Sequence, residues 1–245
     1  MSSFRSHNAE VAKFDADAAT WWDPRGNSRW LHKYNPLRVA YLRDAASRRW
    51  TRPEGADCLH GIRILDIGCG AGVLCEEIAK LGGTVMGLDP GGNLIQVARD
   101  HALQSGVSVD YRCGTVESLV ASGERFDVAM AMEVVEHVAD SGLFLEACTE
   151  LVNPGGLFIL STINRTFKSL VYAIVMGEYV LRLLPPRTHQ WGRFLRPSEI
   201  AASLERKGLR LLDVSGVTLN LRTDDLQLST DIQVNYMLTA ERPKS

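Results

Sequence analysis

The sequence predicts an α/β fold built around a mostly parallel sheet. Between residues 63 and 162, apolar segments of strand length alternate with segments that have helical periodicity. This order places neighbouring strands parallel, with a right-handed crossover helix between them. Near the end of the chain, two strand-like segments follow one another without room for a helix. We therefore expect an antiparallel addition to the sheet.

The first 50 residues have helical character. The apolar residues that recur there at helical spacing are Val11, Phe14, Ala18, Trp21 and Trp22. A break rich in turn residues, at positions 23–27, ends this first helical stretch. A second helix is expected to begin after Asn35, with Pro36 at its first position.

The central part of the chain supplies the parallel strands. The five expected strands cover residues 63–67, 84–88, 107–112, 126–132 and 157–162. The helices expected between them cover residues 73–81, 93–105, 116–122 and 134–151. An Asn-Pro-Gly-Gly turn at 153–156 precedes the fifth strand. We then expect a helix at 199–207 and strands at 209–217 and 230–241, the last as an edge strand because it alternates apolar and polar residues.

Length and composition exclude several classes of protein. The 245 residues are enough for one α/β domain with a sizeable core. A net charge of -2 gives no sequence-wide basic field, so no nucleic-acid partner is expected. Five cysteines without the spacing of a disulfide framework indicate reduced thiols in the cytoplasm. We expect neither a signal peptide nor a spanning helix.

Three glycines at alternate positions follow the first expected strand. Gly68, Gly70 and Gly72 allow positive φ and a close approach of the backbone to a ligand. Asp89, at the end of the next strand, is placed to accept hydrogen bonds from ribose hydroxyls. Val73 occupies the position at which a dinucleotide fold would have its third glycine, which weakens the case for NAD or FAD as the ligand. We predict a nucleoside ligand, with a purely structural turn as the alternative.

A second cluster follows the fourth expected strand. On a helix, Glu133, Glu136 and His137 fall at i, i+3 and i+4 and therefore share one side. Two carboxylates and an imidazole could hold a divalent cation with open positions for substrate oxygens. The alternative is that the acids only complement the dipole at a helix start.

Four motifs between residues 60 and 165 resemble the class I S-adenosylmethionine-dependent methyltransferases. They are the turn at 65–72, the acid Asp89, the strand opening at 126–128 and the Pro-Gly-Gly at 154–156. The resemblance implies their Rossmann-like fold, with a mostly parallel seven-stranded sheet and an antiparallel C-terminal strand. It divides one domain into an N-terminal helical lid at 8–50, a cofactor-binding core at 60–165, a helical insertion at 165–197 and a C-terminal part at 198–245. The glycine turn would lie against the methionine moiety of the cofactor.

Further motifs resemble the ubiquinone-biosynthesis O-methyltransferases more specifically. These motifs occupy residues 21–23, 32–38, 132–137, 161–165 and 234–237. The resemblance implies methylation of phenolic hydroxyls on 2-polyprenyl-6-hydroxyphenol and 3-demethylubiquinol. It assigns S-adenosyl-L-methionine to Arg38, Asp66, Gly68, Gly70, Gly72, Asp89 and Met132. It assigns a divalent metal, expected to be Mg²⁺, to Glu133, Glu136 and His137.

The predicted chemistry suits these residue types. A phenol with a pKa of about 10 is a poor nucleophile while it is protonated. A bound cation would stabilise the phenolate and orient adjacent ring oxygens. The imidazole of His137, with an ordinary pKa of about 6.5, would serve as a metal ligand or as the base. Glu133, Glu136 and His137 are therefore the predicted catalytic residues.

The insertion combines an apolar stretch, residues 169–184, with surrounding basic residues. The basic residues are Arg165, Lys168, Arg182, Arg187, Arg193 and Arg196. Such a helix is suited to the interface of an anionic bilayer, and a core or lid helix is the alternative. We therefore predict a cytoplasmic protein associated peripherally with the inner face of the membrane through residues 165–196. Other ubiquinone-biosynthesis proteins are expected as further partners.

Three other functions remain open from the sequence. The first is a soluble class I methyltransferase that acts on another small molecule. The second is a nicotinamide-dependent oxidoreductase, and the third is a catalytically silent lipid-binding protein that kept the fold.

Overall fold

The computed structural model describes residues 11–26, 28–51, 55, 57–171, 191–220 and 223–244. Its centre is an eight-stranded sheet in the order β3-β2-β1-β4-β5-β8-β6-β7. The strands are β1 Arg63–Ile67, β2 Thr84–Asp89, β3 Asp110–Cys113, β4 Phe126–Met132, β5 Val152–Ile163, β6 Arg210–Asn220, β7 Asp225–Ser229 and β8 Asn235–Glu241. Strands β1 to β5 are parallel, whereas β8 is antiparallel to both β5 and β6, and β7 is antiparallel to β6.

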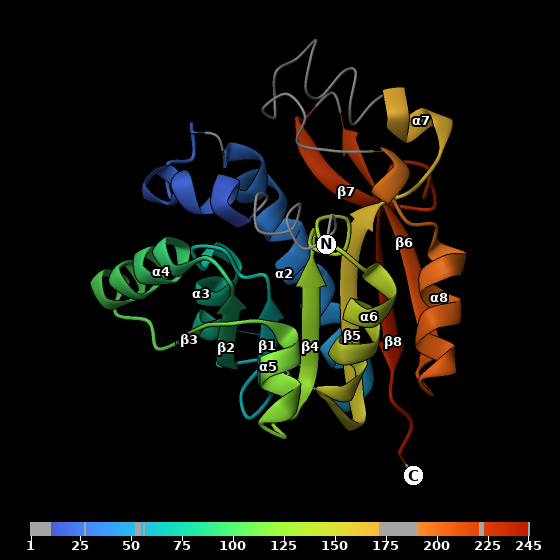
Figure 1. Cartoon of the computed structure of the whole chain (residues 1–245), viewed down its shortest axis with the longest axis horizontal. Helices are drawn as coiled ribbons and strands as arrows, with labels where there is room; N and C mark the ends of the chain where they lie inside the picture. The colour runs from blue at the N-terminus through green and yellow to red at the C-terminus, as the bar shows by residue number, and fades with distance from the viewer. Residues whose placement is uncertain are drawn as a thin grey trace.

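Helices cover both faces of the sheet (Figure 1). The helical elements are η1 Ala18–Thr20, α2 Arg29–Trp50, α3 Val73–Lys80, α4 Gly92–Ser105, α5 Val116–Ala121, α6 Ser141–Glu150, α7 Phe167–Ser169, η3 Trp191–Arg193 and α8 Pro197–Arg206. Helices α2, α3 and α4 share one buried cluster, and α5, α6 and α8 share another. Neighbouring strand residues enter opposite clusters, as Ile64 and Leu65 do, because successive side chains point to opposite faces of a strand.

Helix α2 begins earlier than the sequence predicts. It runs from Arg29 to Trp50 and passes through Pro36, so the expected start at this proline is wrong. Pro36 is exposed, and its ring removes only one backbone donor from the helix. Buried residues on both sides of it, among them Tyr34 and Tyr41, hold the helix against the sheet. Tertiary packing therefore overrides the local signal for a helix start.

The expected helix at 134–151 is also wrong over its first third. Residues 133–140 form a loop of turns and bends, and α6 begins at Ser141. The Asp140 side chain caps α6, because its Oδ1 accepts from the backbone N–H groups of Gly142 and Leu143 at 2.9 and 3.0 Å. The cluster at 133–137 therefore lies on a loop.

The sheet has one more strand than the seven expected. Strand β7 lies at its edge, beside β6. Strand β5 includes the expected turn at 153–156, where its pairing with β4 shifts register between Phe126 and Val128. The predicted last strand, 230–241, is shorter and begins at Asn235. Its expected place at the edge of the sheet is wrong, because β8 pairs with β5 on one side and β6 on the other. The predicted third strand, 107–112, forms over Asp110–Cys113.

The predicted membrane-contact stretch falls largely outside the described residues, which stop at 171 and resume at 191. Two of its basic neighbours are ion-paired within the protein, Arg165 with Glu199 and Lys168 with Asp231. In the part of the chain that the structure describes, no helix is both long and apolar enough to cross a bilayer.

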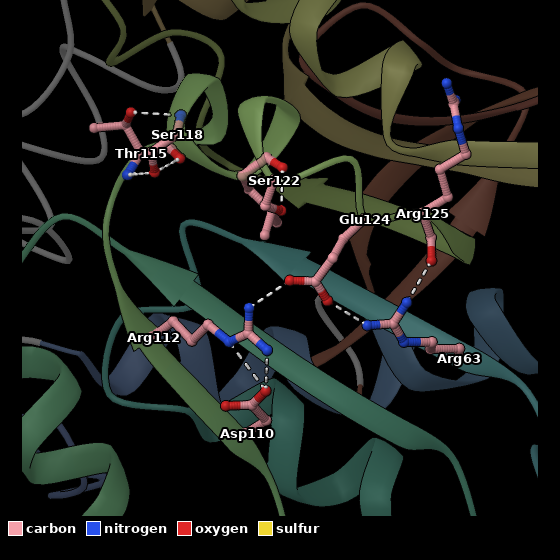
Figure 2. A network of polar contacts seen from close by, with 9 residues as sticks. Arg63, Asp110, Arg112, Thr115, Ser118, Ser122, Glu124 and Arg125 are labelled. Carbon is pink, nitrogen blue, oxygen red and sulfur yellow. Dashed lines mark hydrogen bonds and ion pairs between the residues drawn. The ribbon is translucent and has the colours of Figure 1, made fainter.

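An ion-pair network joins the first residue of β1 to β3. Figure 2 shows Glu124 between two guanidinium groups, with Arg112 on one side and Arg63 on the other. Each guanidinium lies 2.5 Å from a different oxygen of Glu124, and Arg112 also pairs with Asp110 at 2.8 Å. The network ties Arg63, the first residue of β1, and Arg112 of β3 to Glu124, which lies two residues before β4.

Candidate active site

The glycine turn lies at the carboxyl end of β1. Gly68, Gly70 and Gly72 have φ values of +73°, +54° and +86°, in the left-handed region that favours glycine. A Cβ on Gly72 would lie 2.1 Å from the hydroxyl oxygen of Tyr111. A Cβ on Gly68 would lie 2.5 Å from Cγ2 of Val134. The backbone therefore makes a turn that only glycine fits, with the loop after β4 packed against it.

Asp89 holds this turn from the neighbouring strand. Its Oδ2 accepts from the N–H of Gly70 at 3.0 Å, and its Oδ1 accepts from the N–H of Gly91 at 2.8 Å. Burial raises the pKa of Asp89, and these two backbone donors oppose the rise. A carboxylate held at the end of β2, beside the turn, is where an α/β sheet places a ribose acceptor.

The N-terminal segment covers the turn. The ring of Trp21 lies so close to Gly70 that a Cβ there would be 2.8 Å from Cζ2. Nε1 of Trp22 donates to the carbonyl oxygen of Ala71 at 2.9 Å. The N-terminal segment therefore lies over the glycine turn, near α3 and α4, where Figure 1 draws it in blue.

Arg38 and Asp66 bring opposite charges to the floor of the site. Both are buried, and the guanidinium carbon of Arg38 lies 4.5 Å from the centre of the Tyr34 ring. Nε and Nη2 of Arg38 have no hydrogen-bond partner among the described residues, and neither does the hydroxyl of Tyr34. Burial raises the pKa of Asp66 to about 6, although a hydrogen bond from Cys75 and the charge of Arg38 oppose it. A zwitterionic amino-acid group would satisfy such a pair.

Met132 and Glu133 end the fourth strand beside the turn. Met132 is buried, and Glu133 takes a φ of +59°, which is rare for a residue with a side chain. Glu133 is half-buried as a residue, but its Oε1 is fully buried and lacks a partner among the described residues. Burial raises the pKa of Glu133 to about 7, the charge of Glu136 adds to the rise, and Arg38 opposes it. Backbone strain and a proton-holding carboxyl thus occur at one residue.

Glu136 is buried beside it. Its Oε2 accepts from the hydroxyl of Thr162 at 2.8 Å, and its Oε1 has no partner within the described chain. His137 contacts the N-terminal segment, where its ring meets Phe14 edge-to-face with 5.3 Å between centres. The loop therefore presents two acidic side chains to each other and directs the imidazole to Phe14.

Glu133 and Glu136 have the donor atoms that a divalent cation needs. The two unpartnered carboxylate oxygens of Glu133 and Glu136 are hard donors of the kind that Mg²⁺ prefers. Among the described residues, however, no three His, Cys, Asp or Glu side chains converge as a metal site, so His137 does not complete the expected triad. The carboxylate pair fits a cation, and the three-ligand arrangement is not assembled here.

Sequence reasoning missed several polar residues of the site. Tyr34, Asn35 and Ser161 are buried and each has a side-chain oxygen without a partner in the described part of the chain. Thr162, which bonds Glu136, is buried as well. Two polar residues, Ser161 and Thr162, in an otherwise apolar strand were the available signal. Tyr34 and Asn35 fall within the family motif at 32–38, but their burial was not expected because the helix was predicted to begin after them.

Comparisons with known proteins decide among the remaining functions. A family model described as a methyltransferase domain matches residues 34–214. A ubiquinone biosynthesis O-methyltransferase of Chelativorans sp. (strain BNC1) is 52% identical, and the match covers 96% of this chain and 93% of that protein. A relative with the same name from Methylobacterium sp. (strain 4-46) is also 52% identical, over 96% of this chain and 94% of its own.

The chain belongs to the ubiquinone biosynthesis O-methyltransferases. This membership confirms the predicted S-adenosylmethionine-dependent O-methyltransferase and gives no support to the oxidoreductase alternative.

Solved structures support the fold. Magnesium protoporphyrin IX methyltransferase from Synechocystis PCC 6803, with bound SAH, superposes with a TM-score of 0.63 at 19% identity and covers 98% of both chains. The [4+2]-cyclase SpnF superposes equally well, with a TM-score of 0.63 at 16% identity, over 100% of this chain and 97% of its own. One fold therefore carries two reactions, so the assignment rests on the relatives at 52% identity and not on the fold.

Proposed function

We propose that this O-methyltransferase methylates phenolic hydroxyls of polyprenylated rings, 2-polyprenyl-6-hydroxyphenol and 3-demethylubiquinol. The observation that carries the proposal is the buried acidic pair, Glu133 and Glu136, on a loop packed against the glycine turn. An acid pair beside a methyl donor suits an acceptor that must lose a proton before it reacts.

S-adenosylmethionine supplies an electrophilic methyl group on a sulfonium. Arg38 and Asp66 would hold its carboxylate and ammonium, and Asp89 its ribose, with Gly68, Gly70 and Gly72 allowing the close approach. Met132 lies at the end of β4 as an apolar wall. These residues together would orient the methyl group toward the loop at 133–137.

Proton transfer from the phenol falls to the acidic loop. A carboxyl with a pKa near 7, such as that of Glu133, takes up and releases a proton close to neutral pH. Glu136, fixed by Thr162, is the neighbouring charge that raises this pKa. When a cation occupies the two glutamates, His137 would accept the proton instead.

A divalent cation, with Mg²⁺ as the first candidate, would be held by Glu133 and Glu136. It would lower the free energy of the phenolate by direct charge stabilisation. The unpartnered oxygens of the two glutamates support this part of the proposal.

The decisive assay incubates the purified protein with labelled S-adenosylmethionine and a short-chain prenyl catechol. We expect label on the ring oxygen, and absence of transfer to any phenol would refute the proposed substrate class. Excess chelator should abolish the activity and Mg²⁺ should restore it. Full activity in chelator would refute the metal while leaving the substrate class intact. In the same assay, Glu133→Gln should lose most of the methyl transfer. The matched control is Glu146→Gln, which replaces a surface carboxylate paired with Lys207 and should keep the activity.

We further propose that the protein works in the cytoplasm, at the inner face of the membrane, through residues 165–196. The exposed Phe167 and Trp191, on either side of the apolar stretch, support this contact. Deletion of residues 169–184 should reduce the fraction of protein that sediments with anionic vesicles to the fraction that sediments with neutral vesicles. Equal sedimentation of the wild-type protein and the deletion variant with anionic vesicles would refute the membrane contact. Other ubiquinone-biosynthesis proteins remain proposed partners there.

A further inference from the structure

Residues 11–22, here called the N-terminal strap, are hydrogen-bonded to the first turn of helix α4 through the side chain of Asp15. Asp15 lies in the strap, and its Oδ1 accepts from the backbone N–H of Asn93 at 2.8 Å and of Leu94 at 3.0 Å. Its Oδ2 accepts from the Asn93 side-chain amide at 2.9 Å. Asp15 thus satisfies free N–H groups in the first turn of α4 from a position 78 residues away in the sequence.

The same helix end serves Asp89, whose role as the ribose ligand rests on the proposed function. Asp89 accepts from the N–H of Gly91, one residue before α4 begins. A Cβ on Gly91 would lie 2.8 Å from an oxygen of Asp15 and 3.1 Å from an oxygen of Asp89. Two carboxylates therefore meet at one helix start, where the N–H groups and the helix dipole offset their mutual repulsion. The charge of Asp15 also adds to the burial that raises the pKa of Asp89.

The rest of the strap contacts both halves of the site. Trp21 lies over Gly70, and Trp22 bonds Ala71 in the glycine turn. The Trp22 ring also stacks on His101 of α4, with 3.4 Å between ring centres and 5° between planes. Phe14, next to Asp15, meets His137 in the acidic loop. Fastening the strap therefore sets contacts with the cofactor turn and the catalytic loop together.

We propose that Asp15 is a positioning residue that couples docking of the N-terminal strap to the binding of S-adenosylmethionine. Ribose hydroxyls that donate to Asp89 reduce the effective negative charge beside Asp15. Asp15 then caps α4 more favourably, and the strap docks more firmly over the ligand. Because the coupling is reciprocal, a firmly docked strap binds the cofactor more tightly.

The test measures binding of SAH by calorimetry and hydrogen exchange of strap amides in the full chain. In the wild-type protein, SAH should slow exchange across residues 11–22. Asp15→Ala should bind SAH about tenfold more weakly and lose this protection, because the cap and the coupling are both removed. Asp15→Asn should keep the affinity for SAH within about twofold, since asparagine caps helices as well as aspartate does. SAH should slow its strap exchange less than in the wild type, because the neutral side chain removes the charge coupling to Asp89.

Two further variants make the result independent of folding defects. Asp100→Ala removes an exposed carboxylate that pairs with Gln96 on the same helix, and it should behave as wild type. Asn93→Asp leaves the core intact but places a second carboxylate beside Asp15. It should therefore also release the strap and weaken the binding of SAH. The proposal is overturned if SAH leaves strap exchange unchanged in the wild type, or if a folded Asp15→Ala or Asn93→Asp protein binds SAH with wild-type affinity.

Discussion

Glu133 combines a left-handed backbone with a carboxyl group that burial keeps protonated up to about pH 7. Its ordinary pKa in the unfolded chain is 4.5, so the folded state binds this proton more tightly. The free energy of unfolding therefore falls as the pH rises from the unfolded pKa through the folded one. The functional group costs stability at the pH at which the enzyme works.

Glu133→Gln should remove that pH-dependent cost, because an amide cannot ionise. Denaturant unfolding in metal-free buffer should show the variant to be more stable by about 1–3 kcal/mol at about pH 8, with no gain below the unfolded pKa. Its methyl transfer should fall by about a hundredfold or more. A variant less stable than wild type at the higher pH would contradict the buried-carboxyl account.

The glycine turn offers a second test at the level of single residues. Gly72→Ala should lower the free energy of unfolding by about 2–4 kcal/mol, because it adds a clash with Tyr111 to the strain of a positive φ. Gly123→Ala is the matched control, since its φ is +74° and nothing lies within 4 Å of the added Cβ. Gly123→Ala should lower the free energy of unfolding by about 1–2 kcal/mol. Equal losses in both variants would show that the clash with Tyr111 does not contribute.

At the scale of elements, α2 contains a proline that its packing tolerates. Pro36 is exposed within the 22-residue helix and deprives it of one backbone hydrogen bond. Pro36→Ala should therefore raise the free energy of unfolding by about 1–2 kcal/mol. Arg43→Ala, another exposed position on α2, should change it by less than about 0.5 kcal/mol and serves as the control. Thermal unfolding of the three proteins gives the comparison, and a destabilised Pro36→Ala would mean that the proline ring itself stabilises the fold.

The core elements could be predicted from the sequence because local patterns and tertiary packing agree there. Apolar runs that end at a glycine or an acidic residue form strands β1, β2 and β4, and the site residues lie at the ends of these runs. The loop at 133–140 could not be predicted, since its residues suit a helix and only the left-handed Glu133 and the Asp140 cap decide otherwise. The contact of Asp15 with α4 joins distant segments and leaves no local pattern.

Across the whole molecule, the Glu124 network lies outside the candidate site. The cofactor turn and the acidic loop follow the carboxyl ends of β1 and β4, whereas Glu124 pairs with Arg63, the first residue of β1, and with Arg112 in β3 (Figure 2). This separation follows from the α/β architecture, in which ligands bind outside the carboxyl ends of the strands. Changes to the network should therefore leave catalysis untouched.

Glu124→Gln tests this separation. Burial would raise the pKa of Glu124, but bonds from Arg112 and Arg63 outweigh it and hold the pKa below its ordinary value. The stabilisation is therefore present above the unfolded pKa of 4.5 and is lost as the pH falls. The variant should lose up to about 1 kcal/mol at neutral pH and less in acid, with kcat and KM unchanged. An altered KM for S-adenosylmethionine would show that the Glu124 network and the cofactor site are coupled.

Strand β8 is the last strand in the sequence but lies between β5 and β6 in the sheet. During synthesis on the ribosome, a nascent chain that has reached β6 must leave the slot beside β5 open. That exposed slot is an unprotected edge that other polypeptides could pair with. Cooperative folding of this enzyme must then wait until residues 235–241 have left the exit tunnel, and a chaperone that shields β5 would be most useful in that interval.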